Sequence, residues 1–180
     1  MDWRKKRKLK GRYDSTADSY DSRYENIQEK KVEAIKEYLK GSTRILDVGC
    51  GTGSLLEEVS SDKELAVGVD FSIEMLRRAR ERLGDAKLIL ADADNLPFQD
   101  GTFDLVVSLT LLQNVPEPSK TIREMARVVE TGGLILVTSL EKKHKPHEIE
   151  EWMDSAGLKP LRAEGIPNSE DVLCVGRNEK

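Results

Sequence analysis

Apolar residues along this chain gather in short runs, and these alternate with segments in which apolar positions recur every three or four residues. The apolar runs predict seven strands, at residues 43–48, 65–70, 87–91, 103–109, 134–139, 158–164 and 171–177. The helically spaced segments predict five helices, at residues 24–40, 53–60, 72–83, 118–130 and 146–156. Strands that alternate with helices are typical of an α/β fold with a mostly parallel sheet and helices on both of its faces.

The most informative segment is the end of the first predicted strand, where an apolar run stops at three alternating glycines, Gly49, Gly51 and Gly53. Glycine has no Cβ, so it adopts positive φ readily and lets a ligand approach the bare backbone. The helix that follows turns its unpaired N–H groups toward that ligand. This strand–turn–helix segment therefore predicts a binding site for a nucleotide-like group.

Two classes of cofactor are bound by such a turn, and the third glycine distinguishes them. Dinucleotide sites use G-x-G-x-x-G, but this chain has Ser54 at the last position and its glycine one residue earlier. The spacing G-x-G-x-G, preceded by an acid, resembles motif I of the class I S-adenosylmethionine (SAM)-dependent methyltransferases of the type 11 kind. The resemblance implies a cofactor turn made of Asp47, Gly49, Cys50, Gly51, Thr52 and Gly53.

A second matching element is the apolar run 66–72, in which the strand ends at Asp70. A carboxylate in this place can accept hydrogen bonds from both ribose hydroxyls, and each charge-assisted bond contributes about 1.5–3 kcal/mol. Dinucleotide enzymes share this acid, and a purely structural role at the strand end is the alternative, although Ser72 is the better helix cap. By the family pattern, Phe71, Ser72 and Met75 join Asp70 at the cofactor.

A third matching element follows the strand at 87–91, where the chain reads A-D-A-D-N-L-P-F. It resembles the family segment in which an acid accepts the adenine amino group and the next residue offers its N–H to a ring nitrogen. That pattern gives these roles to Asp92 and Ala93, with Ala91 and Leu96 beside them. Asp94 is a rival for the adenine, and an ordinary polar loop is the alternative. Dinucleotide folds do not require this element, so it argues against a nicotinamide-dependent oxidoreductase.

The rest of the resemblance covers the chain from about residue 13 to residue 178. Residues 101–115 resemble the fourth strand of the family, with Ser108 and Leu109 near its cofactor end. Residues 123–137 resemble its helix, Gly-Gly turn and fifth strand. The family then implies a Rossmann-like fold with seven strands, in which the antiparallel seventh strand inserts between the fifth and sixth, and a ligand beyond the carboxyl ends of the strands.

The cofactor implied is SAM, and the product is S-adenosylhomocysteine (SAH). Because its methyl group is already activated on a sulfonium, alignment supplies much of the catalysis. A general base is needed only where the acceptor must lose a proton early. No catalytic residue is assigned from the sequence, and Tyr20 and Asn114 are the candidates. Asn114 can equally cap or solvate the segment that follows. No metal site is expected, because His144 and His147 stand outside any metal-ligand spacing.

The chain is expected to consist of a basic arm with a lid at residues 1–23 and a single SAM-binding domain at residues 24–180. In the arm, Tyr13 and Tyr20 belong to a Y-D-S-T-A-D-S-Y-D segment. This segment resembles a lid that precedes motif I in many family members, where the tyrosines close over the methionine end of SAM. A disordered polar arm is the alternative.

Composition and cysteine usage lead us to expect a cytoplasmic protein. No apolar run approaches the 18 residues of a membrane span, and no signal peptide pattern is found at the start. Hydrophobic residues make up 38% of the chain, and the only cysteines are Cys50 and Cys174. Because Cys50 lies in the cofactor turn, a disulfide is not expected and a reducing compartment fits.

Charge gives the first of two indications of the methyl acceptor. Residues 1–12 carry a net charge of +6 and the remaining residues −10, for a total of −4. A basic arm on an acidic domain suits a polyanion, although a solvated tail is the alternative. The connection after the fifth strand is also short, at residues 141–146, and leaves a cleft suited to a large acceptor or to a partner protein that completes the site.

These features slightly favour tRNA, rRNA or a translation protein as the acceptor. RNA would bind through residues 1–12, and an activating protein partner is a further candidate. A small-molecule methyltransferase and a SAM-binding module without catalysis remain the alternatives. The oligomeric state is left open.

Overall fold

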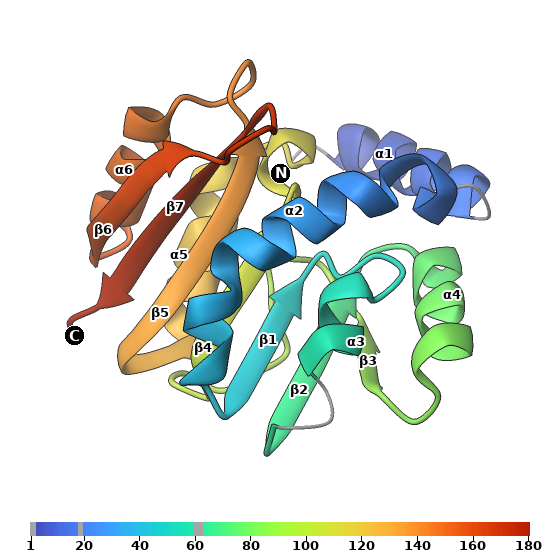
Figure 1. Cartoon of the computed structure of the whole chain (residues 1–180), viewed down its shortest axis with the longest axis horizontal. Coiled ribbons are helices and arrows are strands. Elements are labelled where there is room, and N and C mark those ends of the chain that lie inside the picture. Colours follow the sequence, from blue (N-terminus) through green and yellow to red (C-terminus); the bar gives the residue numbers. More distant parts are fainter. Residues whose placement is uncertain (1–2, 18–19, 60–62) are drawn as a thin grey trace.

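The computed structural model describes residues 3–17, 20–59 and 63–180, with side chains for all of these except residues 3, 5, 16 and 20–26. One seven-stranded sheet runs through the molecule in the order β3-β2-β1-β4-β5-β7-β6 (Figure 1). Its strands are β1 (Arg44–Val48), β2 (Leu65–Asp70), β3 (Lys87–Leu90), β4 (Phe103–Leu109), β5 (Val129–Leu140), β6 (Leu158–Gly165) and β7 (Asp171–Asn178).

The direction of the strands confirms the Rossmann-like methyltransferase topology expected from the sequence. The pairs β1–β2, β1–β4, β2–β3 and β4–β5 are parallel. Strand β7 lies between β5 and β6 and is antiparallel to both. The carboxyl ends of β1, β2 and β4 therefore meet at one edge of the sheet, where the predicted site residues are concentrated.

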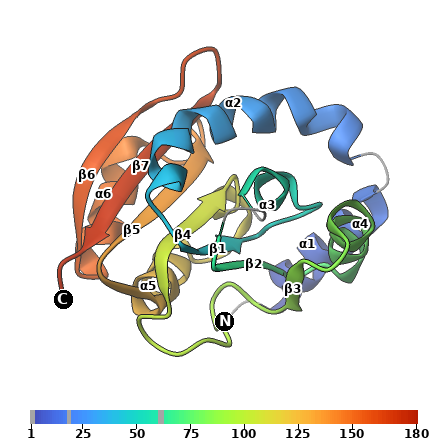
Figure 2. The same ribbon diagram turned by 60° about the horizontal axis from the view of Figure 1, so that its bottom comes forward.

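Helices cover both faces of the sheet (Figure 2). On one face lie α2 (Tyr20–Lys40), α3 (Ser54–Val59) and α4 (Ile73–Leu83), and on the other α5 (Pro118–Val128) and α6 (Pro146–Ser155). Side chains alternate along the pleated strands, so Leu105 and Val107 of β4 join the core under α2 and α3, while Val106 joins the core under α5. A strand that is apolar on both faces is expected in a sheet that has helices packed on both of its faces.

The basic arm is a helix, α1 (Trp3–Thr16), and α2 begins at Tyr20, earlier than the predicted residue 24. The sequence pattern missed both features because residues 3–24 are mostly polar, which hides the apolar periodicity of a helix. Figure 1 shows α1 beside α4, at the end of the molecule toward which β1 points. The arm therefore lies over the edge of the sheet that carries the predicted site.

Other elements match their predictions except at their ends. Strand β5 begins at Val129, five residues before the predicted start at residue 134, because Val129 pairs with Phe103 ahead of a register shift in the β4–β5 ladder. A 3-10 turn, η2 (Leu112–Asn114), follows β4. Within the described ranges, no helix combines the length and apolarity that a bilayer crossing requires.

Candidate active site

A cavity of about 90 Å³ lies at the carboxyl ends of β1, β2 and β4, between the glycine turn and α1. Eleven of the predicted cofactor residues line it, and they come from five separate segments of the chain. They are Tyr13, Gly49, Gly51, Asp70, Phe71, Ser72, Met75, Ala91, Asp92, Ala93 and Leu109. Asn114, one of the two catalytic candidates, also lines this cavity.

The three glycines of the turn all have positive φ, at +79°, +53° and +86° for Gly49, Gly51 and Gly53. A Cβ on Gly53 would lie 2.6 Å from Leu83 Cδ1, so this glycine lets the turn pack against α4. A Cβ on Gly51 would have no heavy atom within 4 Å. Gly51 therefore leaves open space on the cavity wall, as the close approach of a ligand to the backbone requires.

The carboxylate of Asp70 is held by the glycine turn. Its Oδ2 accepts a hydrogen bond from the N–H of Gly51 at 2.9 Å, and its Oδ1 accepts one from the N–H of Ser72 at 2.8 Å. Each oxygen keeps lone-pair capacity for a further donor such as a ribose hydroxyl. Burial raises the pKa of Asp70, and the backbone N–H groups oppose this rise.

Ser72 is the helix cap, as the sequence indicates, since its Oγ accepts a hydrogen bond from the N–H of Met75 at 3.2 Å. The same hydroxyl donates to Asp14 Oδ1 of α1 at 2.5 Å. This bond ties the predicted lid to the start of α4.

Asp92 is the acid that lines the cavity, whereas Asp94 is 5% exposed and accepts a hydrogen bond from Thr121 of α5 at 2.6 Å. Both carboxylates contact the Lys6 ammonium of α1. Burial lowers the pKa of Lys6, but the hydrogen bonds that it donates to Asp92 and Asp94, with the charges of these carboxylates, outweigh that effect and leave the pKa raised. Lys6 thus stays charged at the adenine end of the predicted site.

Six predicted cofactor residues are not among those that line the cavity. Asp47 is 3% exposed, and burial, followed by the charge of Asp70, raises its pKa to about 8. The Ser108 hydroxyl donates to the carbonyl of Val48 at 2.9 Å and so joins β4 to β1. The other four of this group are Cys50, Thr52, Gly53 and Leu96. The side chain of Tyr20, the second catalytic candidate, lies outside the described residues.

The sequence analysis missed the cavity residues that α1 and the β4–η2 connection contribute. From α1 these include Lys6 and Leu9, which precede Tyr13 by seven and four positions and so lie with it on one helical face. That spacing was a usable signal, but the seven basic residues around it favoured a polyanion-binding arm. From the connection they include Thr110 and Leu111.

A second cavity, of about 740 Å³, adjoins the first. The two share Leu9, Tyr13, Thr110 and Asn114 in their walls. Thr110 has a φ of +66°, which is unusual for a β-branched residue and is typical of functional sites. The Asn114 amide donates to the Thr110 carbonyl at 3.0 Å. Asn114 therefore fixes the turn that precedes it and lines both cavities, and its catalytic role stays a prediction.

Gln113 has a structural role. Its Oε1 accepts hydrogen bonds from Ser139 Oγ at 3.2 Å and from the N–H of Leu140 at 3.1 Å. These contacts hold η2 against β5.

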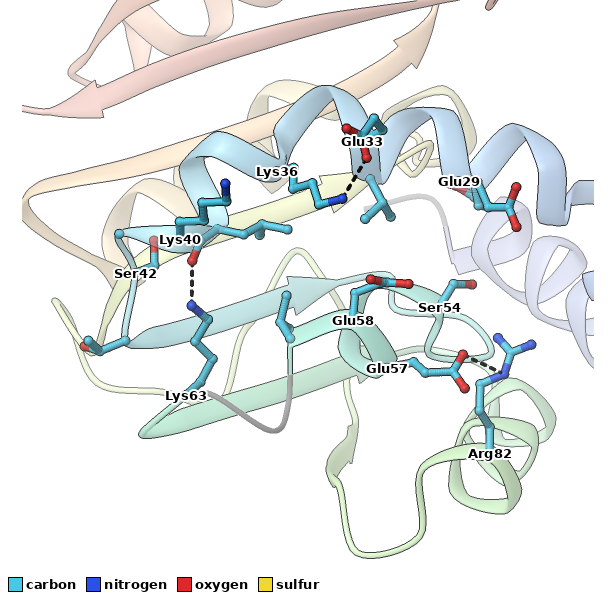
Figure 3. A pocket seen from close by; sticks show the side chains of 16 residues that line it. Glu29, Glu33, Lys36, Lys40, Ser42, Ser54, Glu57, Glu58, Lys63 and Arg82 are labelled. Carbon is cyan, nitrogen blue, oxygen red and sulfur yellow. Dashed lines mark hydrogen bonds and ion pairs between the residues drawn. The ribbon is translucent and has the colours of Figure 1, made fainter.

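A third cavity, of about 730 Å³, lies between α2 and α3 (Figure 3). Charged side chains that pair with one another cross it or line its walls. Lys36 pairs with Glu33 at 3.0 Å and Arg82 with Glu57 at 3.6 Å, and Lys63 donates to a backbone carbonyl of α2 at 2.5 Å. No glycine of the turn lines this third cavity, and we assign no ligand to it.

Residues 46–137, about half of the chain, match the methyltransferase domain family. The chain belongs to the class I SAM-dependent methyltransferases. It is 42% identical over 102 residues to a phosphatidylethanolamine N-methyltransferase of Cereibacter sphaeroides, covering 53% of this chain and 50% of that protein. It is 32% identical over 154 residues to a malonyl-[acyl-carrier protein] O-methyltransferase of Marinomonas sp., covering 82% and 57%. The chain thus spans about half the length of the curated relatives it matches.

Solved methyltransferase structures share the fold over most of the chain. A chain of the complex between the Haloferax volcanii Trm112 methyltransferase activator and a methyltransferase has a TM-score of 0.75 at 21% identity, covering 93% of this chain and 98% of that chain. Magnesium protoporphyrin IX methyltransferase from Synechocystis, solved with bound SAM, has a TM-score of 0.73 at 19% identity, covering 89% and 84%.

SAM is the cofactor of this methyltransferase family member, and the residues at the first cavity fit it. Gly51 leaves the backbone accessible, and Asp70 offers two oriented oxygens to hydroxyl groups. A cavity of about 90 Å³ is well below the roughly 300–1,000 Å³ of ordinary ligand pockets. SAM therefore needs more room than this cavity offers with its walls, α1 among them, in their present positions. Over the residues described, no group of His, Cys, Asp and Glu side chains is arranged to hold a metal ion.

Proposed function

We propose that this protein transfers the methyl group of SAM to an acceptor bound in the second cavity, releasing SAH. The observation that carries this proposal is the shared wall of the two cavities, formed by Leu9, Tyr13, Thr110 and Asn114. One cavity has the glycine turn and the carboxylate suited to the adenosyl part of the cofactor. The other is a separate volume of about 740 Å³ in direct contact with it.

Within this proposal, a macromolecular acceptor such as tRNA, rRNA or a translation protein is favoured. Arg4, Arg7 and Lys8 are exposed on α1, which covers the site, and give it a basic outer surface. Not all of the basic arm is available for RNA, because Lys6 is buried against Asp92 and Asp94. Two of the curated relatives have a phospholipid or an acyl carrier protein substrate in their names. These names support a small or carrier-bound acceptor as the second candidate.

An activating protein partner belongs to the same proposal. Its support is the Haloferax volcanii neighbour, which is described in a complex with the Trm112 activator. Purified protein that methylates its acceptor only after addition of a protein fraction would support this part, and full activity of the purified chain would contradict it.

The deciding experiment incubates the protein with methyl-labelled SAM and fractionated cell extract. We expect label in the RNA or protein fraction, and label in small metabolites would instead support the second candidate. Calorimetric titration with SAM and with NAD accompanies it. SAM binding without transfer in any fraction would indicate a binding module, and NAD binding in place of SAM would overturn the proposal.

A further inference from the structure

We infer that the floor of the second cavity recognises a neutral hydrogen-bond donor on the methyl acceptor, such as an amide or a heterocyclic N–H, through Asp171 and Gln28. This inference rests on the proposed function and adds the chemical class of the acceptor. It concerns the group that anchors the acceptor in the cavity and leaves open which of its atoms receives the methyl.

Two oxygen atoms at this cavity are buried and have no hydrogen-bond partner among the described residues, Gln28 Oε1 on α2 and Asp171 Oδ1 at the start of β7. The Asp171 side chain is 2% exposed. A buried acceptor atom without a donor is costly, and native structures leave few of them. A hydrogen-bond donor on a ligand would supply the partner that each oxygen lacks.

The rest of the floor is fixed by ionic and hydrogen bonds. Lys31 of α2 is 2% exposed, lies 3.2 Å from Asp171 Oδ2 and donates to Thr110 Oγ1 at 2.5 Å. The Ser169 hydroxyl donates to the same Asp171 Oδ2 at 2.9 Å. With Oδ2 occupied twice, the orientation of the carboxylate is set, and Oδ1 is the oxygen left for a ligand.

Lys31 also connects this floor to the shared wall. Thr110, to which it donates, is held from behind by β5, because its N–H donates to Thr138 Oγ1 at 3.0 Å. The strained backbone of Thr110 is thus supported from two sides. Asp171 and Thr110 are thus linked through Lys31, and both line the second cavity, which Thr110 shares with the cofactor cavity.

The charges around the cavity select a neutral donor. Lys31 and Asp171 compensate each other at the floor. On the rim, Arg12, Lys30 and Lys143 outnumber Glu170, which pairs with Lys142 at 2.7 Å. The positive rim disfavours a cationic ligand, and the two bare oxygens disfavour an anionic one. A neutral N–H or O–H donor avoids both penalties.

Three benzene derivatives with one ring and different head groups test this inference: benzamide as the neutral donor, benzamidine as the cation and benzoate as the anion. Each is titrated into SAH-loaded protein, and binding is measured from the NMR shift of the Thr110 amide. We expect benzamide to bind at least threefold more tightly than either of the others. Tighter binding of benzamidine or benzoate, or no shift at Thr110 with any probe, would overturn the inference.

The variant Asp171→Asn sharpens the test because it is isosteric. Lys31 and Ser169 both donate, so they retain the amide oxygen at the Oδ2 position and place the NH2 group where Oδ1 was. The ratio of benzamide to benzoate affinity should then fall at least tenfold. Glu170→Gln, at the neighbouring exposed acid, is the matched control and should leave that ratio within twofold. If Asp171→Asn does not fold, Gln28→Met should lower the ratio at least threefold, and an unchanged ratio there contradicts the inference.

These probes separate the inference from the proposed function, since their binding requires no methyl transfer. If probe binding depends on Asp171 but no methyl group is transferred to any extract fraction, the inference of a donor-binding site stands and the proposed methyl transfer is contradicted. Transfer that is unaffected by Asp171→Asn and Gln28→Met would keep the proposed function and remove the inference.

Discussion

The Lys6 ammonium lies 2.6 and 2.7 Å from the two carboxylate oxygens of Asp92, the residue expected to bind the adenine amino group. The Lys6 ammonium and the adenine amino group both donate hydrogen bonds, so they compete for the Asp92 carboxylate. Lys6 also lies 2.5 Å from Asp94 Oδ2, which fixes α1 over the cavity. The contact joins the position of the N-terminal helix to the state of the cofactor site.

Replacing Lys6 tests this competition. Lys6→Met keeps the length of the side chain and removes the donor, so Asp92 becomes available and α1 is held less firmly. We expect SAH to associate at least threefold faster in stopped-flow measurements. Lys8→Met, at an exposed position of the same helix, is the control. An unchanged association rate for Lys6→Met would show that α1 does not limit access to the site.

Asp70 should dominate cofactor affinity. Its Oδ1 and Oδ2 are oriented by the N–H groups of Ser72 and Gly51, and charge-assisted hydrogen bonds to ribose contribute about 1.5–3 kcal/mol each. Asp70→Ala should weaken SAM binding at least tenfold by calorimetry. The thermal midpoint of the variant, measured alongside, separates loss of binding from loss of fold. Equal calorimetric affinity in a folded variant argues against the ribose role.

Sequence periodicity located the sheet and the glycine turn because both depend on local residue types. The positions of Gly49, Gly51 and Asp70 follow from a short segment in which spacing determines geometry. Lys6 and Thr110 could not be found in that way, since their roles depend on where α1 lies and on contacts with Asp92 and Lys31 that are distant along the chain. The strong basic charge of the arm also concealed that part of it is buried.

The glycines of the turn should differ in what they support. A Cβ on Gly51 meets no atom within 4 Å, whereas a Cβ on Gly53 lies 2.6 Å from Leu83. Both have positive φ, so each alanine costs about 1–2 kcal/mol of backbone strain. Gly51→Ala should lose little stability beyond that strain, but it should weaken SAH binding at least fivefold. Gly51→Val should abolish SAH binding. Gly53→Ala should mainly lower the melting temperature.

Comparing the two alanine variants by calorimetry and thermal unfolding checks this assignment. If Gly51→Ala bound SAH as the wild type does, the turn would not approach the ligand as closely as proposed. If Gly53→Ala kept the wild-type melting temperature, neither the positive φ of this residue nor its approach to Leu83 would constrain the turn.

Asp47 should make stability depend on pH. Burial, and then the charge of Asp70, raises its pKa in the folded protein to about 8, compared with about 4 in an unfolded chain. Between these values the folded state holds a proton that the unfolded state has lost. The free energy of unfolding therefore decreases as pH rises through this window and levels off above the folded pKa.

The side chain in the variant Asp47→Asn cannot ionise, so its contribution to the free energy of unfolding should not decrease with pH. Thermal unfolding from pH 5 to pH 9 should show a melting temperature close to that of the wild type at the acid end and increasingly higher toward pH 8. Each kcal/mol recovered corresponds to about 2–4 °C for a chain of this size. The raised pKa of Asp70 acts in the same direction, so part of the slope should remain in the variant. Asp85→Asn, at an exposed position, controls for the substitution itself. A difference between Asp47→Asn and wild type that stays constant across the range would mean that Asp47 is ionised in the folded protein, and the carboxylate pair beneath the glycine turn would then carry two negative charges.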